Sequence, residues 1–375
     1  MDRTTMKTVC KIDQCTGCAA CVDVCNKGAI NIVDNIRTYN AIINPDLCVK
    51  CGLCERICPN NSLVATQHPI AWYQGWATNE QVRMASSSGG VATAIALEFV
   101  KSKGVVCSCT FKDGKFIFDF AYTVDEIKKF TGSKYVKSTP NGIYKKLKEL
   151  LKANTKVLVI GLPCQIAAVK HVIGNNPLLY TIDLICHGTP SPKILEMFLN
   201  EKGCPITKIA DIRFRKKTDF FLSNGIKPIE LPSVMDMYTY LFLKSVSYTE
   251  NCYSCYYASL NRVSDITLGD SWGTLLSADE VKKGISLILC QTEYGKSILE
   301  NTSLHLENVD LDNAIINNKQ LLQPSYKPKE HSRFYFVLNK IHRFDVSAFV
   351  CFPLIYIRFM LKSLVVKLYR RKSKY

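Results

Sequence analysis

The sequence predicts two folded units in series, a small α+β module followed by a larger α/β domain. The chain has 375 residues, of which 47% are hydrophobic and 21% charged, so it can build a sizeable core and is not disordered. Nine of its 18 cysteines fall within the first 58 residues, and eight of these nine form two runs of identical spacing. From about residue 71 the pattern changes to short apolar strands that alternate with helices, as in α/β proteins.

The two cysteine runs share the spacing C-x2-C-x2-C-x3-C and repeat with a period of 33 residues. This is the spacing of bacterial ferredoxins with two [4Fe–4S] clusters, in which the fourth cysteine of each run binds the cluster of the other run. Zinc sites, the alternative, normally use two C-x2-C pairs instead of triplets. The expected ligands are Cys15, Cys18, Cys21 and Cys58 for cluster one, and Cys48, Cys51, Cys54 and Cys25 for cluster two.

Each cysteine run is expected to lead into a short strand, over residues 29–32 and 62–65, and the module is expected to span residues 1–68. The first residues contain no apolar core of a signal peptide. We therefore expect a cytoplasmic protein, whose cysteines bind metal in a reducing compartment and do not pair as disulfides.

The second domain, residues 69–326, is expected to contain a parallel sheet. Two strand-then-helix units in tandem indicate it, because parallel strands need a crossover connection. The expected elements are a helix over 90–103, a strand from 105, a strand over 156–161 with a helix over 164–172, a strand over 179–185 with a helix over 191–201, and a strand over 266–270.

Two cysteines follow neighbouring strands of this sheet. Cys164 and Cys186 lie at carboxyl ends of strands, where open α/β sheets bind ligands. Cys252 and Cys255 add a C-x2-C pair, which brings the thiols to four, the count for a third cluster. The alternatives are buried apolar thiols at the first two positions, and a redox disulfide or half a zinc site at the pair.

Two polar loops suit an anionic ligand. The serine loop precedes an apolar helix, whose N-terminus can bind a phosphate, although serine is also an ordinary capping residue. The lysine loop places a lysine beside a glycine turn, where it can pair with a phosphate or a reduced flavin, or remain solvated. The serine loop is Ser86, Ser87, Ser88, Gly89 and Gly90, and the lysine loop is Gly132, Ser133, Lys134 and Tyr135.

The doubled cysteine runs are followed, in this order, by the motifs SSSGG, GSKY, G-x-PCQ, D-x-ICHG-x-PSP, C-x2-C and SDITLGD-x-WG. With this order of motifs, the chain resembles the family of the coenzyme F420 hydrogenase/dehydrogenase beta subunit over about residues 1–300. The resemblance implies a ferredoxin-like module followed by a flavin-binding α/β domain. It implies FAD held by the serine and lysine loops, and it strengthens the expectation of a third cluster. His187 and Asp270 then become candidate proton donors near the flavin, with support of the cluster loop as the alternative for His187.

Two functions follow from this resemblance. The first is an iron–sulfur flavoprotein oxidoreductase that exchanges single electrons with a protein donor or acceptor. FAD would then transfer hydride to or from an organic acceptor, either coenzyme F420 or a different molecule. The second is an electron-transfer subunit without a substrate of its own, docked to a hydrogenase- or dehydrogenase-like partner.

The net charge of +16 comes mainly from the end of the chain, where residues 327–375 hold twelve basic and two acidic residues. The rest of the chain has no aromatic-interleaved basic stripe, which argues against nucleic-acid binding. The apolar run near the end is interrupted by Arg358 and Lys362, so it is unsuited to spanning a membrane. We expect residues 327–375 to form a basic amphipathic tail at the inner membrane surface, with docking on the flavin domain or in a partner's groove as alternatives.

Overall fold

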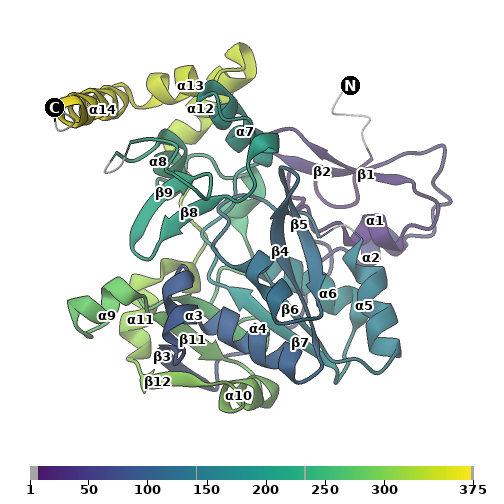
Figure 1. Cartoon of the computed structure of the whole chain (residues 1–375). Helices are drawn as coiled ribbons and strands as arrows, with labels where there is room; N and C mark the ends of the chain where they lie inside the picture. Colours follow the sequence, from purple (N-terminus) through teal and green to yellow (C-terminus); the bar gives the residue numbers. More distant parts are fainter. Residues whose placement is uncertain (1–6, 141, 232–233, 373–375) are drawn as a thin grey trace.

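The large domain is built on one mixed sheet of eight strands (Figure 1). The computed structural model describes residues 7–140, 142–231 and 234–372. The strands lie in the order β12-β3-β11-β10-β7-β6-β4-β5. Along the chain they are β3 (Ala71–Ala77), β4 (Val105–Lys112), β5 (Lys115–Ala121), β6 (Val157–Gly161), β7 (Leu179–Leu184), β10 (Ile266–Asp270), β11 (Ser286–Cys290) and β12 (Leu304–Asn308).

The centre of this sheet is parallel and both of its edges are antiparallel. Strands β4, β6, β7 and β10 pair in parallel, whereas β5 at one edge and β11, β3 and β12 at the other pair antiparallel. The prediction of tandem strand–helix units with parallel strands is confirmed. The antiparallel strands at the edges are an addition that the sequence pattern did not predict.

Helices cover both faces of the parallel strands, which explains why these strands are apolar throughout. On β6, Val157 and Val159 pack against α5 and α6, while Leu158 and Ile160 pack in the cluster that contains α4 and α10. The helices around the sheet are α3 (Glu80–Ala85), α4 (Val91–Lys101), α5 (Ile143–Lys152), α6 (Pro163–Ile173), α9 (Ala278–Lys283), α10 (Glu293–Glu300) and α11 (Leu311–Asn317). Short 3-10 helices are η1 (Asp125–Phe130), η2 (Ile206–Lys208), η3 (Glu250–Ser254) and η4 (Lys319–Leu321).

The N-terminal module is a hairpin with two short helices that lies beside α5 and α6 (Figure 1). The hairpin is β1 (Ile30–Asp34) with β2 (Tyr39–Ile43), and the helices are α1 (Ala20–Val24) and α2 (Leu53–Arg56). Hydrogen bonds attach the module to α5, because Tyr144 Oη donates to the carbonyl of Cys18 (2.6 Å) and Tyr144 N–H donates to Asp23 (3.2 Å). The module is therefore fixed against the large domain by specific polar contacts.

The strand predicted over residues 62–65 is wrong. The first strand of the module pairs with β2 instead, and the backbones of Thr8 and Val9 pair on the other side of β2. The chain after residue 62 leaves the module, and Gln67 exchanges two backbone hydrogen bonds with Arg262 of the large domain (2.8 and 2.9 Å). The internal repeat predicts a strand after the second cysteine run, but the segment that pairs with β2 beside β1 is the one around Thr8 and Val9.

A second layer of the large domain consists of a two-stranded ribbon and helices around a separate core. Its elements are α7 (Pro192–Glu201), β8 (Arg213–Lys216), β9 (Asp219–Ser223), α8 (Met237–Leu243), α12 (Lys329–Ile341) and α13 (Phe344–Cys351). Phe334, Tyr335, Leu338 and Phe344 are fully buried in this core. Residues 329–351, which were predicted to belong to an amphipathic tail, therefore complete the core of the domain.

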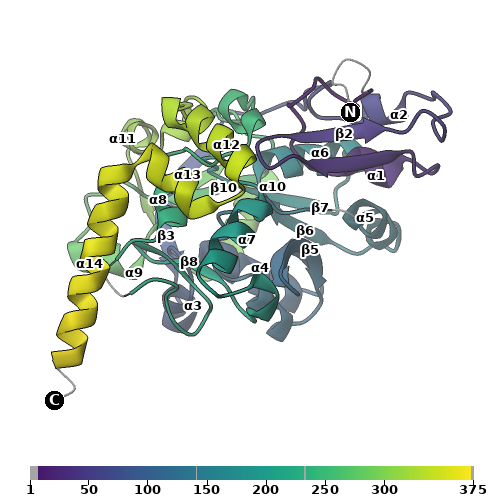
Figure 2. The same ribbon diagram turned by 90° about the horizontal axis from the view of Figure 1, so that it is seen from above.

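Among the described helices and strands, only α14 (Pro353–Lys372) leaves the body of the molecule, and Figure 2 shows it extending along one side with its last turns beyond the rest. Among the described residues, no single helix has the length and apolar character needed to cross a membrane. α13 and the first part of α14, Pro353–Leu368, meet those requirements only as a pair, and they are bent by 117° at the break between them.

Candidate cluster and cofactor site

The four cysteines expected for cluster one lie together and are buried. All four line one small cavity in the module, although three come from the first run and one from the second. Gly17, with φ at 75°, lies in the loop between the first two and donates its N–H to Cys15 Sγ (3.4 Å). A Cβ at this position would be strained by the left-handed backbone. These cysteines are Cys15, Cys18, Cys21 and Cys58.

The four cysteines expected for cluster two lie closer to solvent. Cys51 is exposed, and Cys25, Cys48 and Cys54 are half-buried at the edge of the same apolar cluster. The alternative of a zinc site requires thiolates at about 2.3 Å from one ion. In the described part of the chain, no three His, Cys, Asp or Glu side chains lie in a group suited to a single ion. Because Cys51 is exposed, the second run lies on the solvent-facing side of the module.

A fifth cysteine, which the spacing did not reveal, lies beside the cluster-one set. Cys10 is buried, lines the same cavity and contacts the thiols of Cys15 and Cys58. Asn60 Nδ2 donates a long hydrogen bond to Cys10 Sγ (3.9 Å). The sequence contains no signal for this contact, because Cys10 precedes the first run and has no counterpart at the matching position of the second.

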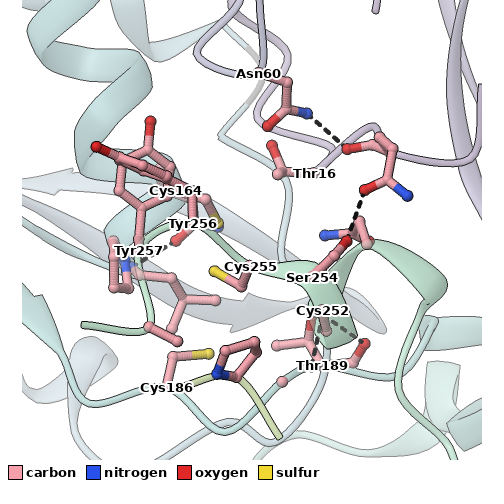
Figure 3. A pocket seen from close by; sticks show the side chains of 18 of the residues that line it. Thr16, Asn60, Cys164, Cys186, Thr189, Cys252, Ser254, Cys255, Tyr256 and Tyr257 are labelled. Atoms are coloured by element: carbon pink, nitrogen blue, oxygen red, sulfur yellow. Dashed lines mark hydrogen bonds between the residues drawn. The ribbon is translucent and has the colours of Figure 1, made fainter. Parts of the chain in front are cut away.

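The other four candidate ligands, Cys164, Cys186, Cys252 and Cys255, line a single cavity of about 430 Å³, the cysteine cavity (Figure 3). They reach it from three separate parts of the fold. Cys164 lies in the first turn of α6, Cys186 follows β7, and the pair lies on and just after η3. Thr16 and Asn60 of the module line the opposite side of the cavity. The cysteine cavity therefore lies between the module and the large domain.

The thiols of the cysteine cavity have the chemistry of a soft-metal donor set. Burial, with a smaller contribution from Cys252 and Cys255, raises the pKa of Cys186 to about 12. Burial also raises the pKa of Cys164 and of Cys255. Protonated thiols of this kind release protons when they bind metal, so occupancy of the cavity is coupled to deprotonation. Four sulfur donors at one cavity fit an iron–sulfur cluster.

The serine and lysine loops contact each other. Ser133 N–H donates to Ser87 Oγ (2.9 Å). The hydroxyls of Ser86 and Ser88 donate to backbone carbonyls, and Gly89 N–H donates to Ser286 Oγ (3.2 Å), so much of the serine loop is held by the protein itself. Gly90, with φ at 84°, occupies the N-cap of α4 and leaves the first turn of this helix without a capping side chain.

Lys134 is held within its own loop. Its ammonium donates to the carbonyls of Phe130 (2.8 Å) and Thr131 (3.1 Å). Burial lowers the pKa of Lys134 to about 8. Its neighbour Gly132 has φ at 86°, and a Cβ there would lie 2.5 Å from Arg213 Nη1, so the turn requires glycine. The predicted contact of Lys134 with a flavin stays a prediction.

Arg215, which the sequence analysis missed, joins both loops to Asp270. Its guanidinium pairs with both carboxylate oxygens of Asp270 (2.6 and 2.7 Å), and it donates to Ser87 O (2.6 Å) and Tyr135 Oη (3.2 Å). Its Nε is buried without a hydrogen-bond partner among the described residues. The cluster of basic residues on and just after β8, from Arg213 to Lys217, was the available signal.

The two candidate proton donors occupy different surroundings. His187 lines the cysteine cavity with its side chain exposed, and partial desolvation lowers its pKa although the charge of Asp270 acts in the opposite direction. Its carbonyl accepts a hydrogen bond from Ser325 Oγ (2.6 Å). Because both oxygens of Asp270 are engaged by Arg215, this carboxylate has a structural role in addition to the predicted catalytic one. Proton donation by either residue stays a prediction.

Three family models match consecutive parts of the chain. Residues 14–62 match the 4Fe-4S dicluster domain. Residues 72–143 match the N-terminal part, and residues 154–312 the C-terminal part, of the coenzyme F420 hydrogenase/dehydrogenase beta subunit. Together these models include both cysteine runs of the module and all four cysteines of the cysteine cavity.

Individual proteins that are similar to the chain include a dehydrogenase subunit and a chain of a hydrogenase complex. One subunit of the F(420)H(2) dehydrogenase of Methanosarcina mazei is 21% identical over 187 residues, which are 46% of this chain and 53% of that protein. The chain thus matches about half the length of this curated relative. A chain of the F420-reducing [NiFe] hydrogenase complex from Methanosarcina barkeri aligns with 18% identity and a TM-score of 0.47, over 73% of this chain and 95% of that one. On the family models, the protein belongs to the family of the coenzyme F420 hydrogenase/dehydrogenase beta subunit and carries a 4Fe-4S dicluster domain at its N-terminal end.

Proposed function

We propose that this protein is an iron–sulfur flavoprotein oxidoreductase with three [4Fe–4S] clusters and FAD, which exchanges single electrons with a partner protein and hydride with an organic molecule. The observation that carries the proposal is the cysteine cavity. Four cysteines from three distant segments meet there, at the boundary between the module and the large domain. When bound, the clusters supply one-electron steps, and the flavin connects these to two-electron chemistry.

In this proposal, partner docking and proton transfer are assigned to different parts of the chain. The second cysteine run faces solvent through the exposed Cys51, so the one-electron partner docks on that side of the module. Thr16, which lies between the first two predicted ligands of cluster one, also lines the cysteine cavity, so the two proposed cluster sites are adjacent. His187 opens into this cavity and can hold or move a proton at its ring nitrogens.

The residues around the serine and lysine loops support a flavin site. The first turn of α4, capped by no side chain, presents N–H groups suited to the FAD phosphates. The buried Nε of Arg215 is a donor without a partner among the described residues, and an anionic ligand group would satisfy it. Lys217, whose ammonium donates to Arg83 O and Ser88 O, adds positive charge beside the serine loop.

Anaerobic purification followed by iron, sulfide and flavin determination tests the proposal. The full chain should contain about twelve iron atoms, three cubes of four, and one FAD. Cys164→Ser and Cys255→Ser should each lose about four iron atoms and retain the rest. Cys204→Ser, at a half-buried cysteine outside every proposed site, is the matched control and should retain all twelve. Eight iron atoms in the unmodified chain would overturn the third cluster.

A second candidate function is an electron-transfer subunit without its own substrate. The name of the relative from Methanosarcina mazei, which is one subunit of a dehydrogenase, favours it. Hydride exchange with reduced coenzyme F420, or with another organic hydride donor, distinguishes the two functions. Flavin reduction by such a donor in the isolated protein supports the oxidoreductase. Reduction only by a one-electron protein carrier supports the electron-transfer role.

We also propose that α14 attaches the protein to an anionic membrane surface. Five apolar residues recur on one side of the helix at alternating spacings of three and four, and all are exposed, from 38% at Ile357 to 81% at Leu354. Arg358 and Lys362 border this stripe, and Pro353–Lys372 contains no acidic residue. Pairing with a second copy would bring like charges together, so the charge favours anionic lipid. The stripe is Leu354, Ile357, Leu361, Leu364 and Leu368.

Co-sedimentation with vesicles tests this attachment. The protein should bind vesicles that contain phosphatidylglycerol and fail to bind vesicles of phosphatidylcholine alone. Replacing Leu361 and Leu364 with glutamate should abolish binding. Leu275→Glu, at an equally apolar residue that is 98% exposed elsewhere on the surface, should leave binding unchanged. Equal binding to both kinds of vesicle, or binding by the double variant, would overturn the proposal.

A further inference from the structure

Lys137 is a buried lysine at the junction between the module and the cysteine cavity. Only 6% of it is exposed, and the ion pairs between described residues do not include it. Its ammonium donates to the carbonyl of Thr16 (3.2 Å) and lies 5.0 Å from the ring centroid of Tyr39. Its backbone N–H donates to the carbonyl of Pro190 (2.9 Å), which fixes the segment that carries it.

The ammonium of Lys137 lies close to two separate sets of thiols. Thr16, which accepts its hydrogen bond, sits between the first two ligands of cluster one. Lys137 also lines the cysteine cavity. It is near enough to act electrostatically on the thiols of Cys15, Cys164 and Cys186. One cation therefore faces both proposed cluster sites at once.

An ammonium buried without a counter-ion is unfavourable, because one carbonyl and one aromatic ring replace only part of its hydration. Negative charge on either side would remove this penalty. Four cysteine thiolates bring such charge to each cluster, and reduction of a cluster adds one more negative charge. The position of Lys137 thus suits a reduced cluster better than an oxidised one.

We propose that Lys137 is the shared counter-ion of cluster one and of the cluster in the cysteine cavity, and that its charge raises the reduction potential of both. This inference rests on the proposed function, since it requires a cluster at each site. It makes Lys137 a positioning residue that acts on potentials, not a ligand. Cluster two, whose cysteines lie on the solvent side of the module, falls outside its influence.

The competing interpretation is that Lys137 only ties two loops together through Thr16. Lys137→Met keeps much of the apolar stem and removes both the charge and the hydrogen bond to Thr16. The readout therefore separates the two: a lost charge lowers the potentials of clusters that remain bound, whereas a lost loop contact lowers the iron content. Lys137→Arg retains the charge. Lys11→Met is the matched control, because Lys11 lines the same cavity but is exposed to solvent.

Potentiometric titration of the intact, cluster-loaded protein, followed by electron paramagnetic resonance, gives the decisive measurement. In Lys137→Met, the ratio of reduced to oxidised cluster at a fixed potential should fall about tenfold at two of the three clusters. That change corresponds to about 59 mV for a one-electron couple. Lys137→Arg, Lys11→Met and cluster two should show no such change.

The outcomes separate this inference from the proposed function. Full iron with unchanged potentials in Lys137→Met overturns the role of Lys137 and leaves the three-cluster proposal standing. Only eight iron atoms in the unmodified chain overturn the three-cluster proposal itself. If Lys137→Met loses iron, Lys137→Arg distinguishes the two interpretations. Full iron and unchanged potentials in Lys137→Arg support the charge role. Loss of iron in Lys137→Arg as well supports the loop contact and overturns the charge role.

Discussion

Arg262 and Asp183 form a fully buried ion pair, with 2.7 Å between Arg262 Nη2 and Asp183 Oδ1. The same guanidinium donates to the carbonyls of Tyr257 (2.9 Å) and Leu184 (3.0 Å). Asp183 lies on β7, three residues before Cys186, and Tyr257 follows Cys255 by two. The pair therefore fastens the end of β7 to the segment behind the C-x2-C motif, and so holds together two walls of the cysteine cavity.

Replacing Arg262 with methionine should destabilise the protein by about 3–5 kcal/mol, because it leaves a buried carboxylate without its counter-ion. The iron content should fall by the equivalent of one cluster. Thermal unfolding and iron analysis measure the two effects. Arg333→Met, at an exposed arginine of α12, should change stability by less than about 0.5 kcal/mol. Full iron retention in Arg262→Met would contradict the role of the pair at the cavity.

Cys10 and Cys58 should behave differently, although both line the cluster-one cavity. The spacing makes Cys58 the fourth ligand and Cys10 only a neighbour. Cys10→Ala should therefore keep the cluster-one signal in electron paramagnetic resonance, and Cys58→Ala should lose it. A preserved signal in Cys58→Ala would show that Cys10 serves as a ligand in its place.

Gly188→Ala should disturb the segment that carries Cys186 and His187. Gly188 has φ at 136°, and a Cβ there would lie 2.3 Å from the ring of Tyr248. The added methyl group must displace either the buried ring or the backbone beside Cys186. We expect a lower unfolding temperature together with a loss of about four iron atoms. Gly203→Ala, where no neighbour lies within 4 Å of the added Cβ, is the control for the strain of a positive φ alone.

Stability should decrease as the pH falls below neutrality, because His331 is buried in its neutral form. Burial lowers its pKa to about 4, from an ordinary value of 6.5. Its ring contacts Tyr253 Oη, Val246 O and Glu250. Since the unfolded chain binds a proton near pH 6.5 and the folded chain does not, stability is lost between about pH 6.5 and 4.

At pH 5.5 the loss from this one histidine amounts to about 1.4 kcal/mol, or about 2 °C in the unfolding temperature of a chain of this length. Glu250 contributes to the loss of stability only at lower pH. Burial raises the pKa of Glu250, but hydrogen bonds from Lys327 and Arg37 outweigh this effect and lower the pKa to about 2. Calorimetry at pH 7.5 and 5.5 gives the measurement. His331→Gln should reduce the difference between the two temperatures, and an unchanged difference would exclude His331 as its source.

The sequence predicted the parts of the fold that depend on local pattern. The parallel strands β6 and β7 were located because apolar runs bounded by turn residues determine them. The strand over residues 62–65 was wrong because this segment leaves the module toward Arg262, which pairs with Gln67 and is distant in sequence. Lys137 and Arg215 were missed for a related reason. Each lies in a polar stretch that is typical of a surface, and only packing between remote segments buries it.

The distribution of ligands along the chain also sets an order of biosynthesis. All eight predicted ligands of the ferredoxin-like module leave the ribosome within the first 58 residues, and Cys58 is the last predicted ligand of the cluster whose first is Cys15. The cysteine cavity must wait until Cys255 has emerged, some two hundred residues later. Because domains fold in the order in which they are made, we expect the three proposed clusters to receive their iron in two stages. A nascent chain arrested between residues 68 and 252 would hold the module's iron and lack the rest.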